Sequence, residues 1–184
     1  MRFLGIDPGL RVTGYGCVEG TGLRGGAKLV EAGAIRLVRA SKTGADEDAG
    51  ERADAASVSS RLVELEGDVI GILDRLRPDV CAVEALFSHY KHPATAIVMG
   101  HARGVILLCL RRAGVKLVEL RPAEVKKSMC GNGQAKKAQV QLAVQARFGL
   151  AEVPKPPDVA DAIAIALCAS ERAGRGESAF GIRQ

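Results

Sequence analysis

The chain has 184 residues, of which 47% are hydrophobic and 26% are charged, a composition that excludes a disordered chain and suits one globular domain. It has no uncharged apolar run of membrane-spanning length and no basic and apolar leader at its start, so we expect a cytoplasmic protein. Its five cysteines lie far apart without CxxC or zinc-ligand spacing, which excludes a zinc-finger type of site and favours reduced thiols in the core.

Three short strands are predicted at the start of the chain. Residues 2–6, 12–19 and 28–38 are rich in β-branched residues and punctuated by glycine, the pattern of a three-stranded meander. Residues 41–57 follow, with five acids and almost no large apolar side chain. We expect this segment to be a mobile surface loop.

The periodicity then changes from that of strands to that of helices. Apolar residues recur at steps of three and four from Leu62 to Leu76, which predicts a helix that ends at Arg77 before a proline. Proline and glycine positions delimit the remaining elements. In chain order these are a strand over 79–84, a helix over 93–113, a strand over 115–120, a short helix over 122–130, a helix over about 134–148 and a last helix over 158–170.

These elements predict an α/β fold with a five-stranded mixed sheet and helices on both faces, in the order βββαβαβαα. We expect a single domain over residues 1–173, with 41–57 as an insertion loop and 174–184 as a flexible tail.

The formal net charge of +5 is unevenly distributed along the chain. Between residues 89 and 147 there are eleven Lys or Arg residues and only two acids, Glu119 and Glu124. A solvated face with scattered lysines is one explanation. A basic half also favours a polyanionic partner, most simply a nucleic acid.

Four acids stand at positions where distant segments can meet. Asp7 ends the first strand and Glu84 ends the fourth, while Asp158 and Asp161 lie three residues apart on the first turn of the last helix. Ligands of α/β sheets collect outside the carboxyl ends of strands, so these side chains are candidates to converge. Each also has a structural explanation, as a turn residue, a strand end, a helix cap or a first-turn acid.

Four carboxylates brought together repel one another and need cations. Oxygen ligands without histidine or cysteine favour Mg²⁺ or Mn²⁺ over zinc. Two such ions about 3.5 to 4 Å apart activate water and stabilise the leaving oxygen when a phosphodiester is hydrolysed. A site of this kind explains why a strand ends on the bare charge of Asp7.

Five ordered motifs resemble those of the RuvC-type Holliday-junction resolvases, which have a ribonuclease H-like fold. They are GIDPGLRVTGYG, AVEALF, GHARGV, EVKKSMCGNGQAKKAQV and DVADAIAIA, and the resemblance that rests on them extends over nearly all of the chain apart from residues 41–57 and the tail. The insertion at 41–57 is longer than the family pattern, and His89 and His92 match no family role.

The resemblance implies a homodimeric, metal-dependent endonuclease of recombination and repair. Such enzymes nick two opposing strands of a four-way junction symmetrically, favour certain short sequences and partner a branch-migration motor. By motif position, the implied metal ligands and catalytic residues are Asp7, Glu84, Asp158 and Asp161, the aromatic that enters the junction is Phe87, and the residues that hold the scissile region are Lys126 and Lys137.

The aromatic and basic residues agree with DNA binding. Phe87 and Tyr90 share one loop with Lys91, and aromatic side chains stack on unpaired bases. The turn at 131–133 is expected to leave backbone N–H groups that hold a phosphate. Core packing of the aromatics and a plain turn with solvated lysines are the alternatives. The expected DNA contacts are Phe87, Tyr90, Lys91, Arg103, Lys126, Lys136 and Lys137.

Two other functions compete with a junction nuclease. An actin-like ATPase or sugar kinase has a similar opening loop, but it needs two such domains, for which 184 residues leave no room. A non-catalytic DNA-binding module explains the basic half and leaves the four acids unexplained. Because a four-way junction presents equivalent strands, we expect a two-fold dimer, with the contact at the helix that carries Gly100 and Gly104.

Overall fold

A computed structural model describes residues 1–20, 26–37, 55–85 and 93–175. Its five strands form one sheet in the order β3-β2-β1-β4-β5. They are β1 (Arg2–Asp7), β2 (Val12–Glu19), β3 (Lys28–Arg36), β4 (Val80–Glu84) and β5 (Lys116–Leu120). The first three are antiparallel neighbours, and β4 runs parallel to both β1 and β5. The predicted mixed sheet is therefore confirmed.

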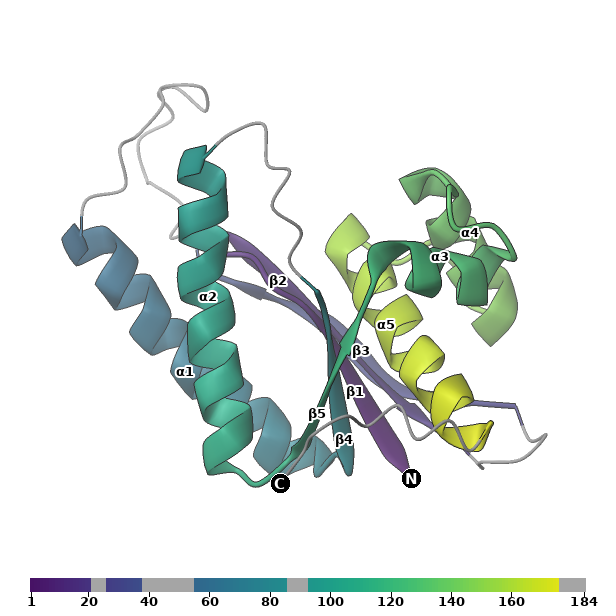
Figure 1. The fold of residues 1–184 in the computed structure, drawn as a ribbon, viewed down its shortest axis with the longest axis horizontal. Helices are drawn as coiled ribbons and strands as arrows, with labels where there is room; N and C mark the ends of the chain where they lie inside the picture. The colour runs from purple at the N-terminus through teal and green to yellow at the C-terminus, as the bar shows by residue number, and fades with distance from the viewer. Residues whose placement is uncertain (21–25, 38–54, 86–92, 176–184) are drawn as a thin grey trace.

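Helices cover both faces of the sheet (Figure 1). On one face lie α1 (Ala55–Leu76) and α2 (Pro93–Arg112), and on the other lie α3 (Pro122–Cys130), α4 (Lys137–Phe148) and α5 (Pro157–Gly174). The expected order βββαβαβαα is one helix short of the structure, although the predicted elements over 122–130, about 134–148 and 158–170 already include all three helices after the last strand. Gly131 adopts a left-handed φ of 72°, which ends α3 and separates it from α4, so three helices follow β5. In the described part of the chain, no helix is long and apolar enough to cross a membrane.

Several element boundaries differ from those predicted. The loop expected over 41–57 ends earlier, since α1 already begins at Ala55, in a run of alanine and serine whose alanines favour helix. The last helix extends to Gly174, into the expected tail. Residues 41–54 and 176–184 lie outside the described residues, and the extent of the single domain stays a prediction.

Alternate residues of the central strands point to opposite faces of the sheet. Phe3 of β1 packs in the core beneath α3, α4 and α5, whereas Leu4 and Ile6 pack beneath α1 and α2. All five cysteines are free thiols and four of them are buried, as expected for core residues. The same alternation places Asp7 and Glu84, at the ends of β1 and β4, on the face that α5 covers.

Helix α5 lies directly on the backbone of β1 and β2. At Gly5, Gly14 and Gly16, a Cβ atom would overlap atoms of α5, and at Gly14 the atom struck is the carbonyl oxygen of Asp158. Glycine is therefore required for this close approach. Because Gly14 pairs with Asp7 across the two strands, the first turn of α5 is held beside that carboxylate.

Candidate active site

Four carboxylates and two lysines from five separate elements line one cavity of about 360 Å³. The acids are Asp7 from β1, Glu84 from β4 and Asp158 and Asp161 from α5, and the lysines are Lys126 from α3 and Lys137 from α4. The structure thus brings together all four acids singled out in the sequence.

The sheet register explains how Asp7 and Glu84 meet. Ile6 of β1 lies opposite Val83 of β4 in a parallel pairing, so the next residue of each strand is the acid. Both acids follow at the carboxyl ends of neighbouring strands and on the same face of the sheet. Asp7 and Glu84 are 77 residues apart in the sequence, with β2, β3 and α1 between them. Helix α1 crosses the sheet and returns the chain to β4, which pairs in parallel with β1.

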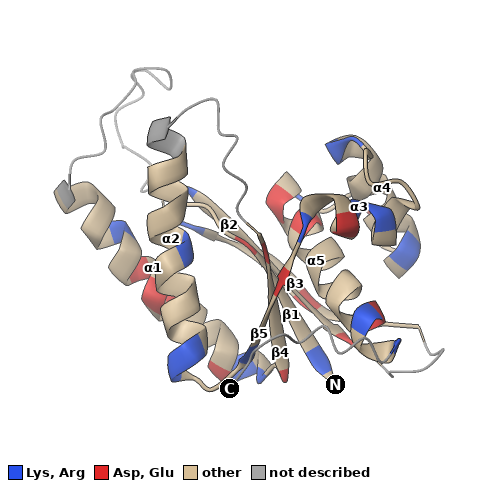
Figure 2. Cartoon of the chain, in the orientation of Figure 1, with Lys and Arg blue, Asp and Glu red and all other residues tan. Residues whose placement is uncertain are grey.

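The start of α5 supplies the other two acids. Pro156 is the N-cap and Pro157 the first helical residue, so Asp158 lies in the first turn and Asp161 one turn further along the same face. Figure 2 shows acidic positions at this end of α5, on the side of the sheet where α3 and α4 carry lysines. The positive end of the helix dipole lies at this end of α5.

Burial and mutual repulsion perturb the acids of the cavity. The pKa of Asp7 is raised to about 7, chiefly by burial and then by the charges of Asp161, Glu84 and Asp158, while Lys137 opposes them. Burial also raises the pKa values of Glu84 and Asp161, and Lys137 again acts in the opposite direction. A cluster that resists carrying its full negative charge is one that a cation would stabilise.

Lys137 supplies a cationic group close to the acids, since its Nζ lies 3.6 Å from Oδ2 of Asp161. With the side chains in this arrangement, no three His, Cys, Asp or Glu groups of the described residues lie close enough to hold a metal ion. The donor set nevertheless suits a hard divalent cation, because the cavity offers four carboxylates and its lining contains no histidine or cysteine.

The free energy of unfolding of the metal-free protein is expected to fall as the pH rises from about 4.5 to about 7. The pKa of Asp7 is 3.8 in a model peptide and about 7 in the folded chain, so the folded state holds this proton more tightly. The stability that this tighter proton binding contributes is present at low pH and is lost as the pH rises through the folded pKa. The shift in pKa corresponds to a loss of at most about 4 kcal/mol in the free energy of unfolding.

Urea unfolding in EDTA at pH 4.5, 6 and 8 measures this effect as the difference between the wild type and Asp7→Asn. The difference in unfolding free energy should move in favour of the variant as the pH rises. The same substitution at Asp74, an exposed acid of α1, should leave the pH dependence unchanged. A difference that is constant over the three pH values would contradict the buried, repelled Asp7.

Arg103 is buried in the fold and not exposed on the surface. We expected a DNA contact, but its side chain is buried, with only 6% of the residue exposed. Nη1 donates a hydrogen bond to the carbonyl oxygen of Glu84 at 2.8 Å, and Nη2 pairs with the carboxylate of Glu119. A guanidinium held on both sides inside the fold is not presented to a DNA surface.

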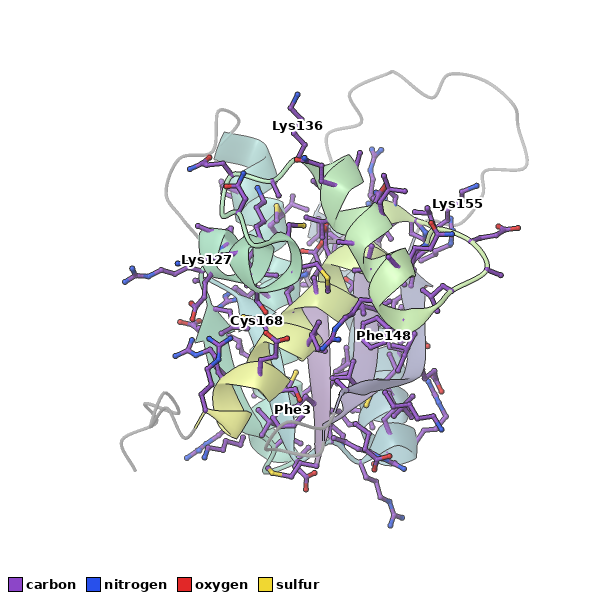
Figure 3. The ribbon with its side chains drawn as sticks, turned by 90° about the vertical axis from the view of Figure 1, so that its right-hand side faces the viewer. Phe3, Lys127, Lys136, Phe148, Lys155 and Cys168 are labelled. Carbon is purple, nitrogen blue, oxygen red and sulfur yellow. The ribbon has the colours of Figure 1, made fainter. Side chains whose placement is uncertain are left out.

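The remaining expected DNA contacts divide into two groups. Lys126 and Lys137 line the cavity, and Lys136 is exposed at the N-cap of α4, where its side chain extends away from the ribbon (Figure 3). Phe87, Tyr90 and Lys91 lie outside the described residues, as do His89 and His92.

The turn before α4 is more occupied than we expected. The N–H of Gln134 donates to Oδ1 of Asn132 at 2.9 Å, and the N–H of Lys136 donates to Oε1 of Gln139 at 2.8 Å. These two backbone groups are therefore not available to a phosphate. Asn132, a short polar side chain between two glycines, was the signal for the first of these two contacts.

Sequence reasoning missed two residues that shape the site from the strand side. Gly14 makes room for the first turn of α5, as described above. Thr13 is fully buried, and its hydroxyl accepts a hydrogen bond from the N–H of Gly9 and donates one to the carbonyl oxygen of Gly9. The hydroxyl thereby fixes the loop that follows Asp7 and lines the cavity. The signal was present in the VTGYG run, where Gly14 and Gly16 alternate with the larger residues Thr13 and Tyr15.

The sheet order, the helices on both faces and the acids at the strand ends define a ribonuclease H-like α/β protein with a carboxylate site. The family model for crossover junction endodeoxyribonuclease RuvC matches residues 3–169. The chain therefore belongs to the RuvC family of crossover junction endodeoxyribonucleases.

Individual relatives agree with this family assignment. The chain is 45% identical over 165 residues to a crossover junction endodeoxyribonuclease RuvC of Rhodopirellula baltica, which covers 90% of this chain and 83% of the relative. It resembles the structure of Thermus thermophilus RuvC with a TM-score of 0.75 and 31% identity, over 96% of this chain and 97% of the other. The Thermus thermophilus protein in complex with a Holliday junction substrate matches with the same TM-score and coverage at 29% identity.

Proposed function

We propose that the chain resolves four-way DNA junctions by hydrolysing a phosphodiester in each of two opposing strands, in recombination and repair. The observation that carries this proposal is the convergence of Asp7, Glu84, Asp158 and Asp161 on one cavity beside two lysines. Such a site has the acids to hold cations and the basic groups to hold a phosphate.

The four carboxylates would hold Mg²⁺ or Mn²⁺, with two ions per site. Divalent cations bound there supply Lewis acidity and a water of lowered pKa. The chain's own contribution is positioning: β1 and β4 hold Asp7 and Glu84 on rigid strand ends, and α5 presents the other two acids from the opposite side. Lys137, already 3.6 Å from Asp161, is free on its other side to bind a DNA phosphate, since 73% of its side chain is exposed.

We further propose that two copies of the chain act together on the two strands of a junction. The outward face of α2 supports this proposal, because Ile97 and Leu108 are 61% and 46% exposed there, with the open positions Gly100 and Gly104 between them. Small residues at such positions let two helices approach closely. Sedimentation analysis of the wild type and of Leu108→Glu would test whether this face joins two copies. Action in the cytoplasm with a branch-migration motor belongs to the same proposal.

The function is tested by incubating the protein with four-way, linear and flap DNAs of the same sequence, with and without Mg²⁺. We expect paired nicks in the four-way junction only, and only with the divalent cation. Binding of junctions without cutting in Mg²⁺ or Mn²⁺ would favour a non-catalytic junction-binding module. Equal cutting of all three DNAs would favour a general nuclease.

Lys137→Ala is expected to weaken junction binding and to make its salt dependence shallower. Loss of one phosphate contact reduces the slope of log K against log salt by about 1. Binding isotherms at several salt concentrations in Ca²⁺ or EDTA measure this slope. Lys28→Ala, at an exposed position of the edge strand β3, is the matched control and should leave the slope unchanged. An unaltered slope for Lys137→Ala would indicate that this lysine pairs with Asp161 but does not bind a DNA phosphate.

A further inference from the structure

We propose that Arg103 is a positioning residue that fixes the catalytic end of β4 from the face of the sheet opposite the active site. This inference rests on the proposed function, in which Glu84 takes part in catalysis. Arg103 lies on α2, on the face of the sheet away from α5, and in the contacts of the described residues its guanidinium reaches the backbone of Glu84 but not the carboxylate of any cavity-lining acid. Its action would therefore pass through the backbone.

The peptide group that follows Glu84 is held at both of its polar atoms. Its carbonyl oxygen accepts the hydrogen bond from Nη1 of Arg103 at 2.8 Å. Its N–H, which belongs to Ala85, donates to the carbonyl oxygen of Leu120 in β5 at 2.8 Å. Strand pairing alone fixes only the second of these atoms, so the guanidinium completes the support at the last residue of the strand.

The partner on β5 makes this support rigid. Glu119 lies opposite Val83 in the parallel pairing of β4 and β5, and its carboxylate pairs with Nη2 of Arg103. The two hydrogen bonds leave the planar guanidinium little freedom to rotate, as is usual for forked contacts of arginine. The side chain of Arg103 is 8% exposed, whereas that of Glu119 is 56% exposed. The guanidinium is therefore buried, and solvent reaches the carboxylate that pairs with it.

This backbone contact has a consequence for the carboxylate of Glu84. The side chain of Glu84 points to the opposite face of the sheet from Arg103, toward the cavity. A strand end without the guanidinium can shift at the peptide after Glu84, and the carboxylate would shift with it. Misplacement of a catalytic group by about 1 Å costs on the order of 10²-fold in rate. Arg103 is thus expected to act on the chemical step and not on DNA affinity.

The test compares Arg103→Lys and Arg103→Met with the wild type under single-turnover conditions on a four-way junction in Mg²⁺. Both variants are expected to lower the cleavage rate constant by about 10- to 100-fold while the dissociation constant for the junction changes less than about threefold. Lysine keeps the charge but cannot make both contacts in the plane of the fork. Arg112→Met, on the same helix and paired with Glu66 at 2.9 Å, is the matched control and should cleave like the wild type.

Three outcomes would overturn the proposal. Weaker junction binding in Arg103→Met that Arg103→Lys restores would make this residue a DNA contact. A lower melting temperature with an unchanged cleavage rate would make its role structural only. If Arg103→Met does not fold, Glu119→Ala removes the acceptor of one of the two hydrogen bonds at an exposed side chain, and a wild-type rate in that variant would contradict the positioning role. Cleavage by the wild type in the same assay tests the proposed function separately.

Discussion

Asp7→Asn is expected to stabilise the metal-free protein at neutral pH and, at the same time, to abolish junction cleavage. The folded chain raises the pKa of Asp7 to about 7 through burial and through repulsion by the neighbouring acids. A neutral amide at this position removes the repulsion, and the gain in unfolding free energy at pH 8 is expected to be on the order of 2–4 kcal/mol. Stability and activity therefore oppose each other at this residue.

The loss of cleavage follows from the same charge. A carboxylate on the end of β1 is proposed to hold a divalent cation, and loss of that interaction costs several kcal/mol in the transition state, or about 10³-fold in rate. Thermal unfolding in EDTA and single-turnover cleavage in Mg²⁺ measure the two effects on one preparation. Asp74→Asn, on the exposed side of α1, should change neither quantity. A variant at Asp7 that cleaves at the wild-type rate would remove this acid from the site.

Divalent cations should also make the wild type more stable than Asp7→Asn, the reverse of the order expected in EDTA. Addition of Mg²⁺ at pH 8 is expected to raise the melting temperature of the wild type, because ligand binding to the folded state stabilises it. The same addition should raise that of Asp7→Asn much less. Equal shifts for both proteins would indicate that the cation binds elsewhere.

Gly14→Ala is expected to destabilise the fold and to impair cleavage together. The new Cβ would overlap the carbonyl oxygen of Asp158 and also crowd its carbonyl carbon, so the first turn of α5 has to move away from β2. Overpacking against backbone costs roughly 1–3 kcal/mol or more. Displacement of Asp158 should lower the cleavage rate by about 10²-fold, as for other misplaced groups.

The matched control is Gly67→Ala on α1, where an added Cβ meets nothing within 4 Å. The identical substitution there should increase the unfolding free energy by about 1 kcal/mol, since alanine is a better helix former than glycine. Cleavage should be unchanged. If Gly14→Ala were as stable and as active as the wild type, the contact between β2 and α5 would not be what holds Asp158 in place.

The sequence predicted the site better than it predicted what supports the site. Asp7 and Glu84 could be placed because each ends a strand, and the alternation of side chains then puts both on one face. Asp158 and Asp161 followed from helical spacing. These inferences need only local periodicity and the rule that ligands collect at the carboxyl ends of strands.

The supporting contacts depend on tertiary structure and leave no local pattern. Arg103 was grouped with the surface cations because nothing near it in the sequence shows that Glu119, 16 residues further on, will pair with it inside the fold. Gly14 looked like one of several strand glycines until α5 was seen to lie on it. The early start of α1 was missed because the acidic residues before Ala55 outweighed the helix-forming alanines.

The most direct measurement of the central claim is an anomalous difference map from crystals grown or soaked in Mn²⁺. That claim is that carboxylates from β1, β4 and α5 jointly bind divalent cations in one cavity. We predict anomalous peaks in this cavity, which Asp7, Glu84, Asp158 and Asp161 line, and their loss in Asp7→Asn. Peaks confined to other parts of the surface, or a cavity without manganese at concentrations that support cleavage, would contradict the account.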